Sequence, residues 1–128
     1  MSHPTELKYT KEHEWVKVEG ELAYVGITDY AQSSLGDIVF VDVPEAGTEI
    51  EAGQSFATIE SVKAVSEIFA PISGTIAEIN GELATAPEKV NADAHAAWLV
   101  KVKIKDPAQL AGLLSAADYE KFIAEEKH

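Results

Sequence analysis

The sequence predicts a mainly β protein, a small barrel or sandwich with short peripheral helices and a C-terminal helix. Short runs that alternate apolar and polar residues recur along the chain, and glycines and prolines separate them, most densely between residues 44 and 81. Such punctuated short strands are typical of barrels and sandwiches rather than of parallel sheets. We expect the 128 residues to form a single domain, with a core of about 7–105 and a helical extension over 106–126.

Three strands are predicted in the first third of the chain. Residues 14–18 alternate, a turn containing Gly20 follows, and residues 22–26 form a second strand-like run, which together indicate a β-hairpin. Residues 38–43 are rich in β-branched side chains. We expect them to form a buried strand that ends at Pro44.

A short helix is predicted between the second and third of these strands. Thr28-Asp29 can cap its start, and it continues to about Leu35. Asp29 and Gln32 stand at capping-box spacing, and Gly36 ends the helix.

Residues 56–69 are the longest segment of the middle region without glycine or proline. Residues 61–64, Ser-Val-Lys-Ala, include none of the residue types that two-residue hairpin turns favour. The local pattern therefore predicts one long strand over residues 56–69.

The last third is predicted to contain one strand and three helical segments. Residues 87–91 favour a helical turn, and residues 98–104 alternate as a strand with outward lysines. Asp106-Pro107 begins a helix, because proline suits the first helical position. Residues 115–118 resemble a cap that opens an amphipathic helix. The apolar face of this helix holds Tyr119, Phe122 and Ile123.

Composition excludes several functional classes. The chain has no cysteine, so it has no disulfide, thiol nucleophile or thiolate metal site. A net charge of −12 disfavours nucleic acid as a partner and favours partners with basic surfaces. The sequence has no apolar segment as long as a membrane span or a signal peptide, so we expect a soluble, intracellular protein.

The sequence also lacks the minimal motifs of common enzymes. No GxSxG, P-loop or GxGxxG pattern occurs, so the sequence does not support a hydrolase or nucleotide-binding function. The histidines show no metal-ligand spacing and no HExxH motif. They are His3, His13, His95 and His128. We expect a chain that is not itself an enzyme.

Two places hold chemistry-bearing side chains, and each also has a simpler interpretation. His13 and Glu14 are adjacent, but neighbours in a strand point to opposite faces and cannot easily act on one substrate. Their simplest reading is a packed Trp15 between solvated neighbours. Lys63, in a strand-forming context, taken alone is a solvated side chain on the outer face of a sheet.

The spacing around Lys63 changes that interpretation. Glycines at 47 and 53 precede Glu60-Ser61-Val62-Lys63-Ala64, and residues 70–74, Ala-Pro-Ile-Ser-Gly, follow it. This constellation resembles the biotinyl/lipoyl-domain superfamily. The resemblance implies a lipoyl-domain-like flattened hybrid barrel or sandwich, in which the modified lysine stands at the tip of a hairpin turn. It thus implies a turn where the local pattern predicts none.

Within that superfamily the chain resembles the glycine cleavage system H-protein family. Biotin carriers typically place the lysine between methionines, whereas the only methionine here is Met1. Residues 8–16, 26–32 and 35–41 also look like H-protein segments. The resemblance spans roughly residues 7–123, nearly the whole chain.

This resemblance implies a lipoyl carrier without catalytic activity of its own. Lipoate would be attached covalently to Lys63, with Glu60, Ser61, Val62 and Ala64 as the recognition turn. The implied partners are the P-protein, a glycine decarboxylase; the T-protein, an aminomethyltransferase; the L-protein, a dihydrolipoyl dehydrogenase; and the lipoylating enzymes. The carrier would shuttle the aminomethyl group of glycine from the P-protein to the T-protein, and the L-protein would reoxidise the arm.

The family is thought to fold the loaded arm into a surface cleft, which protects it from hydrolysis. Matching positions make Glu14 the first candidate to bind the arm's amine and Glu67 the second. Glu67 replaces the usual aspartate, and Ala94 and Ala97 stand where the family tends to have proline and glycine. An alanine at 97 is expected to alter the turn before Trp98 if that turn needs a positive φ.

Three alternatives remain open from sequence. The chain could act as a lipoyl relay or donor for other lipoate-dependent complexes, as an enzyme that uses His13 or His95, or as a structural module whose Lys63 is never modified. The initial Met1 and the compact start favour a bacterial cytoplasmic protein over one of an organelle matrix.

Overall fold

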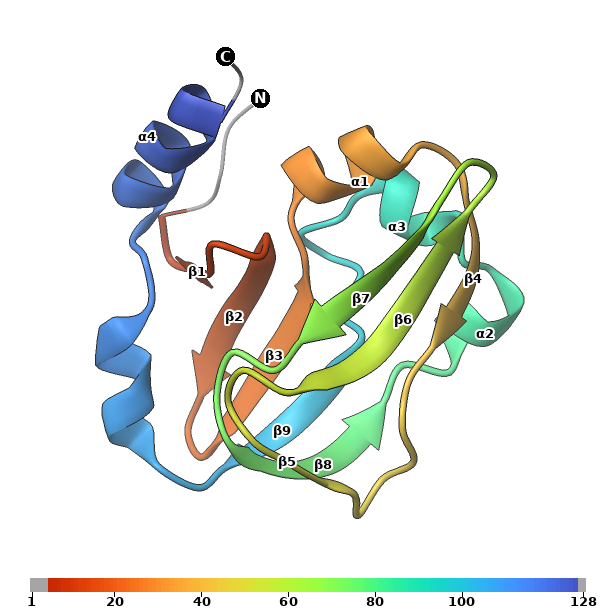
Figure 1. Cartoon of the computed structure of the whole chain (residues 1–128). Coiled ribbons are helices and arrows are strands. Elements are labelled where there is room, and N and C mark those ends of the chain that lie inside the picture. The colour runs from red at the N-terminus through yellow and green to blue at the C-terminus, as the bar shows by residue number, and fades with distance from the viewer. Residues whose placement is uncertain (1–4, 127–128) are drawn as a thin grey trace.

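The computed structural model describes residues 5–126, and it shows two antiparallel β-sheets with helices at their margins (Figure 1). The six-stranded sheet has the order β1 (Lys8–Tyr9), β2 (Glu14–Glu19), β3 (Leu22–Ile27), β9 (Val100–Ile104), β8 (Gly74–Ile79) and β5 (Glu49–Ile50). The three-stranded sheet has the order β4 (Ile38–Asp42), β6 (Ser55–Ser61) and β7 (Val65–Phe69). The predicted fold class is confirmed, and the sheets remain separate, as in a sandwich.

The predicted hairpin of residues 14–18 and 22–26 forms as β2 and β3, with Val16 opposite Val25. Val16 faces the main core between the sheets, whereas Trp15 faces a second apolar cluster with Tyr9 and Tyr119. Both faces at the start of β2 are therefore covered. For this reason Glu14, Trp15 and Val16, three consecutive residues of β2, are all buried. The simpler expectation, that the neighbours of Trp15 are solvated, is therefore wrong for Glu14.

Residues 56–69 form β6, a turn and β7, so the prediction of one long strand is wrong and the turn implied by the resemblance is right. The Ser61 hydroxyl accepts hydrogen bonds from the backbone N–H groups of Lys63 (3.3 Å) and Ala64 (3.0 Å). The Ser61 N–H also donates to the Ala64 carbonyl at 2.8 Å. The Ser61 side chain thus closes the turn, and the turn needs neither of the residues, glycine or asparagine, by which hairpin turns are usually predicted from sequence.

The predicted helix after β3 is α1 (Asp29–Leu35). Its N-cap is Thr28, whose hydroxyl accepts from the Ala31 N–H at 3.2 Å. Gly36 ends it with φ +83°. Gln32 bonds the Asp29 carboxylate at 2.9 Å, so this pair lies within the helix and does not form the capping box.

The strand predicted over residues 38–43 is β4, but it is not buried throughout. Ile38 and Val41 face the core, whereas Val39 and Phe40 are exposed. The reason is that the three-stranded sheet is covered on one face only, so the outward side chains of β4 stay exposed. A β-bulge between Ile38 and Phe40 accompanies this arrangement.

The C-terminal third follows the prediction with shifted bounds. The helical turn expected at 87–91 is α3 (Lys89–Ala92), which an unpredicted α2 (Glu82–Thr85) precedes. The helix expected after Asp106 is a 3-10 helix, Pro107–Gly112. The predicted second cap is correct, because the Ser115 hydroxyl accepts from the Asp118 N–H at 3.1 Å at the start of α4 (Ala116–Glu126). No helix of residues 5–126 is long and apolar enough to cross a membrane.

Candidate functional site

Lys63 lies in the turn between β6 and β7, the hairpin labelled in Figure 1. It is exposed together with Val62 and Ala64. The Val62 N–H donates to the Asp37 carbonyl at 3.0 Å, which ties the tip to the segment before β4. The stem of Lys63 passes over Gly36, since a Cβ at position 36 would lie 3.6 Å from its Cε. The turn is thus held by its own hydrogen bonds and by a neighbouring segment, while the amine stays free to be reached.

All the residues predicted for the recognition turn gather at this tip. Glu60 and Ser61, which end β6, are half-buried, and the three residues that follow are exposed. A flexible four-carbon stem on a rigid turn places a primary amine where another protein can reach it.

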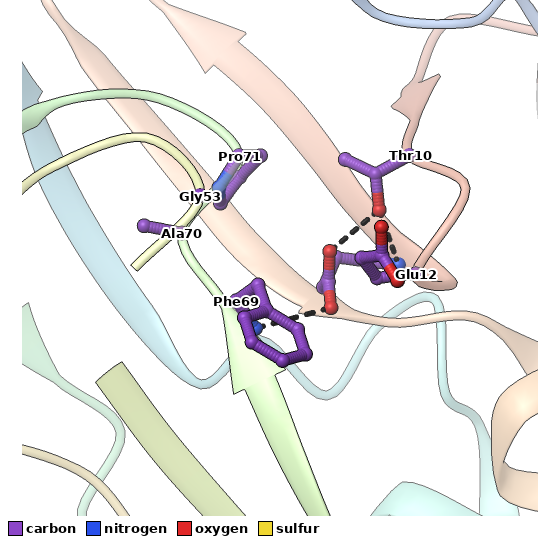
Figure 2. A pocket seen from close by; sticks show the side chains of 7 residues that line it. Thr10, Glu12, Gly53, Phe69, Ala70 and Pro71 are labelled. Carbon is purple, nitrogen blue, oxygen red and sulfur yellow. Dashed lines mark hydrogen bonds between the residues drawn. The ribbon is translucent and has the colours of Figure 1, made fainter. Parts of the chain in front are cut away.

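Glu14 lies in a different environment, with 1% of its surface exposed. The Thr10 hydroxyl donates a hydrogen bond to its Oε1, and the Phe69 N–H donates to its Oε2 at 3.2 Å. Dashed lines from Thr10 and Phe69 mark these two hydrogen bonds in Figure 2. Burial raises the pKa of the Glu14 carboxyl from 4.5 to about 7, although both hydrogen bonds act to lower it. This carboxyl therefore changes charge near neutral pH.

A cavity of about 320 Å³ opens beside the Glu14 carboxylate. Its wall combines the turn before β2 with the end of β7 and the loop around Gly53 (Figure 2). The lining residues are Thr10, Glu12, Glu14, Gly53, Phe69, Ala70 and Pro71. Thr10, Glu12 and Phe69 were not predicted from the sequence: Thr10 and Glu12 reach the site through the turn before β2, and Phe69 reaches it only through a contact 55 positions along the chain.

A second cavity, of about 270 Å³, lies between α1 and β7. Its lining residues are Glu12, His13, Ile27, Tyr30, Ala31, Ser34, Leu35, Ser66 and Ile68. Ser34 and Leu35 lie next to Gly36, over which the stem of Lys63 passes. Glu12 lines both cavities, so the two adjoin there. We call these two neighbouring cavities, one beside the residues next to Gly36 and the other beside Glu14, the arm groove.

Glu67, the other candidate arm contact, is exposed and is not among the residues that line either cavity. Its carboxylate accepts a hydrogen bond from the Ser55 hydroxyl at 3.3 Å across the β6–β7 pair. The geometry therefore places Glu14, and not Glu67, in the groove wall.

His13 and His95 each make a side-chain contact with a distant residue. His13 lines the second cavity, and its Nδ1 lies 2.8 Å from the Tyr119 hydroxyl. His95 accepts a hydrogen bond from the Asp29 N–H at 3.3 Å. His3 and His128 lie outside the described residues. Within residues 5–126 no group of three His, Cys, Asp or Glu side chains is placed to hold a metal ion.

The two alanines at unusual positions fit without backbone strain. Ala94 and Ala97 are buried, and the Ala94 carbonyl accepts a hydrogen bond from the Trp15 indole N–H at 3.0 Å. Among residues 5–126, His13 is the only non-glycine residue with positive φ. Ala97 therefore does not need the conformation that glycine would favour.

The comparisons with known proteins all match this chain to one family, over nearly its whole length. The profile of the family "Glycine cleavage H-protein" matches residues 7–126. The glycine cleavage system H protein of Koribacter versatilis (strain Ellin345) is 63% identical over 126 residues, and that of Acidobacterium capsulatum is 54% identical over 126 residues. Each of these alignments covers 98% of this chain and 98% of the relative.

A solved structure gives the same result. The crystal structure of a glycine cleavage system H protein from Mycobacterium marinum matches with a TM-score of 0.84 and 37% identity. The match covers 91% of this chain and 95% of that one.

A two-sheet β fold that displays one lysine on a hairpin tip defines a carrier protein of the lipoyl-domain class. Its function is to present an attached group to other proteins. The chain belongs to the glycine cleavage H-protein family, whose members are the lipoyl carriers of the glycine cleavage system.

Proposed function

We propose that this chain carries lipoate as an amide on Lys63 and shuttles the aminomethyl group of glycine from the P-protein to the T-protein, with reoxidation of the arm by the L-protein. The observation that carries the proposal is the exposed amine of Lys63 on a turn whose backbone is fixed by Ser61 and Asp37. When attached, lipoate supplies the sulfur that bears the transferred group. The protein supplies position, reach and shelter.

Loading requires only that a neutral Lys63 amine meet an activated acyl group. The nitrogen attacks the acyl carbonyl, the leaving group departs, and the nitrogen loses its proton to solvent as the amide forms. The amide is uncharged, so the side chain loses its positive charge. Exposed neighbours on both sides of Lys63 leave room for the loading enzyme to approach the amine.

The arm groove suits a parked arm whose end carries an amine. Its cavity beside α1 is lined mainly by apolar side chains, among them Ile27, Leu35 and Ile68. Its far end holds the Glu14 carboxylate, which the Thr10 hydroxyl and the Phe69 N–H orient. An ammonium bound there would gain a charge-assisted hydrogen bond in a site sheltered from water. Glu67 stays a second candidate contact outside the groove.

Support for the cellular setting comes from the relatives, which are bacterial, and we place the protein in the bacterial cytoplasm. Its proposed partners are the P-, T- and L-proteins and the lipoylating enzymes. Its role is that of a non-catalytic subunit, since each chemical step belongs to a partner.

Peptide mapping and reconstitution test this proposal together. Protein incubated with lipoylating enzymes should gain one lipoyl group, located on Lys63 by mass spectrometry. With the P-, T- and L-proteins, tetrahydrofolate, NAD and glycine, the loaded protein should support NADH formation. Lys63→Arg, which keeps charge and length but cannot be loaded, should abolish both signals. Glycine-dependent activity that survives Lys63→Arg would contradict the proposal.

A further inference from the structure

Exposed apolar side chains gather around Lys63. Among the described residues, six large apolar side chains are strongly exposed, and four of them lie on or beside the β6–β7 hairpin. These four are Val39 (53% exposed), Phe40 (48%), Val62 (69%) and Val65 (64%). The other two, Val18 and Ile79, lie on the six-stranded sheet. Exposed apolar residues that gather in one patch are typical of interaction sites.

The strand register aligns part of this group. Phe40 pairs with Glu60, and Glu60 pairs with Val65, so these three lie in one row across the three-stranded sheet. Ile59, next to Glu60, is fully buried, which shows that the row points away from the core. We call this outer surface, with Val39 and Val62 at its margin, the lysine face.

The charge of the lysine face is of one sign. Two residues further along the strands, on the same face, Asp42 pairs with Thr58 and Thr58 pairs with Glu67, and both carboxylates are exposed. They flank the first row, in which Glu60 itself lies between Phe40 and Val65. Strands β4, β6 and β7 contain no lysine or arginine, and Lys63 itself becomes neutral when acylated.

We propose that the lysine face is the docking surface for the enzyme that acylates Lys63, and that this enzyme presents an apolar patch rimmed by basic side chains. The inference rests on the proposed loading of Lys63. The loading enzyme meets the chain before any arm is attached, and a single lysine side chain contributes little affinity. Its affinity must come from the protein surface beside the lysine. Apolar contact area bordered by polar and charged side chains is the composition of a specific interface.

Steady-state loading of purified, unmodified protein by a lipoate ligase with lipoate and ATP tests the apolar part. Phe40→Ser and Val65→Ser should each raise KM roughly tenfold and leave kcat within about twofold, because loss of an interface anchor costs of the order of 1.4 kcal/mol. Val18→Ser and Ile79→Ser are matched controls from the other sheet and should load as the wild type does. Thermal unfolding of all four variants checks that the fold is kept.

Charge reversal tests the rim. Asp42→Lys should lower kcat/KM several-fold at low salt, and the difference should shrink at high salt, because salt screens the attraction. Glu49→Lys, an exposed reversal on β5, should have little effect.

The outcomes separate this proposal from the one on which it rests. A wild-type chain that loads, with Phe40→Ser and Val65→Ser loading equally well, would overturn the docking surface and leave the carrier function standing. Equal impairment of the Val18→Ser and Ile79→Ser controls would also overturn it. A wild-type chain that is never loaded on Lys63 would remove the carrier function and the docking surface together.

Discussion

The Tyr119 hydroxyl lies 2.8 Å from Nδ1 of His13, and this contact joins the C-terminal helix to the turn that precedes Glu14. The same hydroxyl lies 2.7 Å from the hydroxyl of Thr28, the N-cap of α1. One side chain of α4 therefore holds both the Glu14 end and the α1 side of the arm groove. His13 adopts φ +72°, a left-handed conformation that costs about 1–3 kcal/mol in a non-glycine residue and needs such support.

Removing the Tyr119 hydroxyl should loosen the arm groove, while α4 stays packed on the rest of the protein. Tyr119→Phe keeps the ring, which stacks on Tyr9 with centroids 4.8 Å apart, and loses both hydrogen bonds. We expect a loss of about 1–2 kcal/mol in the free energy of unfolding by urea, since the hydroxyl of Thr28 is left buried. Tyr24→Phe, on the face of the six-stranded sheet beside Trp98, is the control and should cost less. Equal losses in both variants would contradict a special role for Tyr119.

The buried carboxyl of Glu14 should make stability depend on pH near neutrality. Its pKa is about 7 in the folded protein and near 4.5 when unfolded, so the folded state binds this proton more tightly. Stability from this group is therefore full below about pH 4.5 and falls as the pH rises to about 7. The loss is about 3 kcal/mol, from 1.36 kcal/mol per unit of pKa difference.

Glu14→Gln isolates this effect because glutamine cannot ionise. We expect the difference in unfolding free energy between wild type and Glu14→Gln to change by about 3 kcal/mol between pH 4.5 and pH 8, in favour of the variant at high pH. Urea denaturation across this range measures it, and Glu19→Gln on the exposed end of β2 serves as the control. Parallel curves for wild type and Glu14→Gln would show that Glu14 keeps an ordinary pKa.

The sequence could predict the elements whose signals are local. Thr28 caps α1, Gly36 ends it, and Ser115 begins α4, each through backbone groups within four residues. The alternation of β2 and β3 likewise predicts their hairpin, since side chains of successive strand residues point to opposite faces.

Features that depend on distant contacts could not be predicted in this way. Glu14 is buried because β7 packs over it and donates the Phe69 N–H, 55 positions away in the sequence. The exposure of Phe40 depends on its sheet being covered on one face only. The turn at Lys63 was found only through family resemblance, because Ser61 replaces the usual turn residues. Lys63 itself carries no local signal that distinguishes it from a solvated lysine.

Gly26 should tolerate no side chain. It pairs with Trp15 across β2 and β3, and a Cβ there would lie 2.6 Å from the indole ring. Gly26→Ala should therefore destabilise the protein by about 1–3 kcal/mol through overpacking and should shift the fluorescence of Trp15. Gly81→Ala is the matched control, because a Cβ at Gly81 meets nothing within 4 Å. Wild-type stability of Gly26→Ala would show that the indole moves aside without cost.

The strongest test of the arm groove is the lifetime of the loaded protein. If the Glu14 carboxylate holds the arm's ammonium, Glu14→Gln keeps the shape of the site and removes the charge. A charge-assisted hydrogen bond contributes about 1.5–3 kcal/mol, so we expect hydrolysis of the loaded arm to become at least about tenfold faster. Protection of the arm in the wild type should weaken as the pH falls, because Glu14 becomes protonated. The ratio of the hydrolysis rates of variant and wild type should therefore approach one.

Glu67→Gln separates the two candidate carboxylates in the same assay. Glu67 is exposed and outside the groove, so we expect its variant to hydrolyse at close to the wild-type rate. Decay can be followed by quantifying formaldehyde and ammonia released from protein loaded by the P-protein and then separated from it. Faster decay in Glu67→Gln with wild-type decay in Glu14→Gln would move the arm contact to the outer face of β7. Wild-type decay in both variants would mean that neither carboxylate protects the arm.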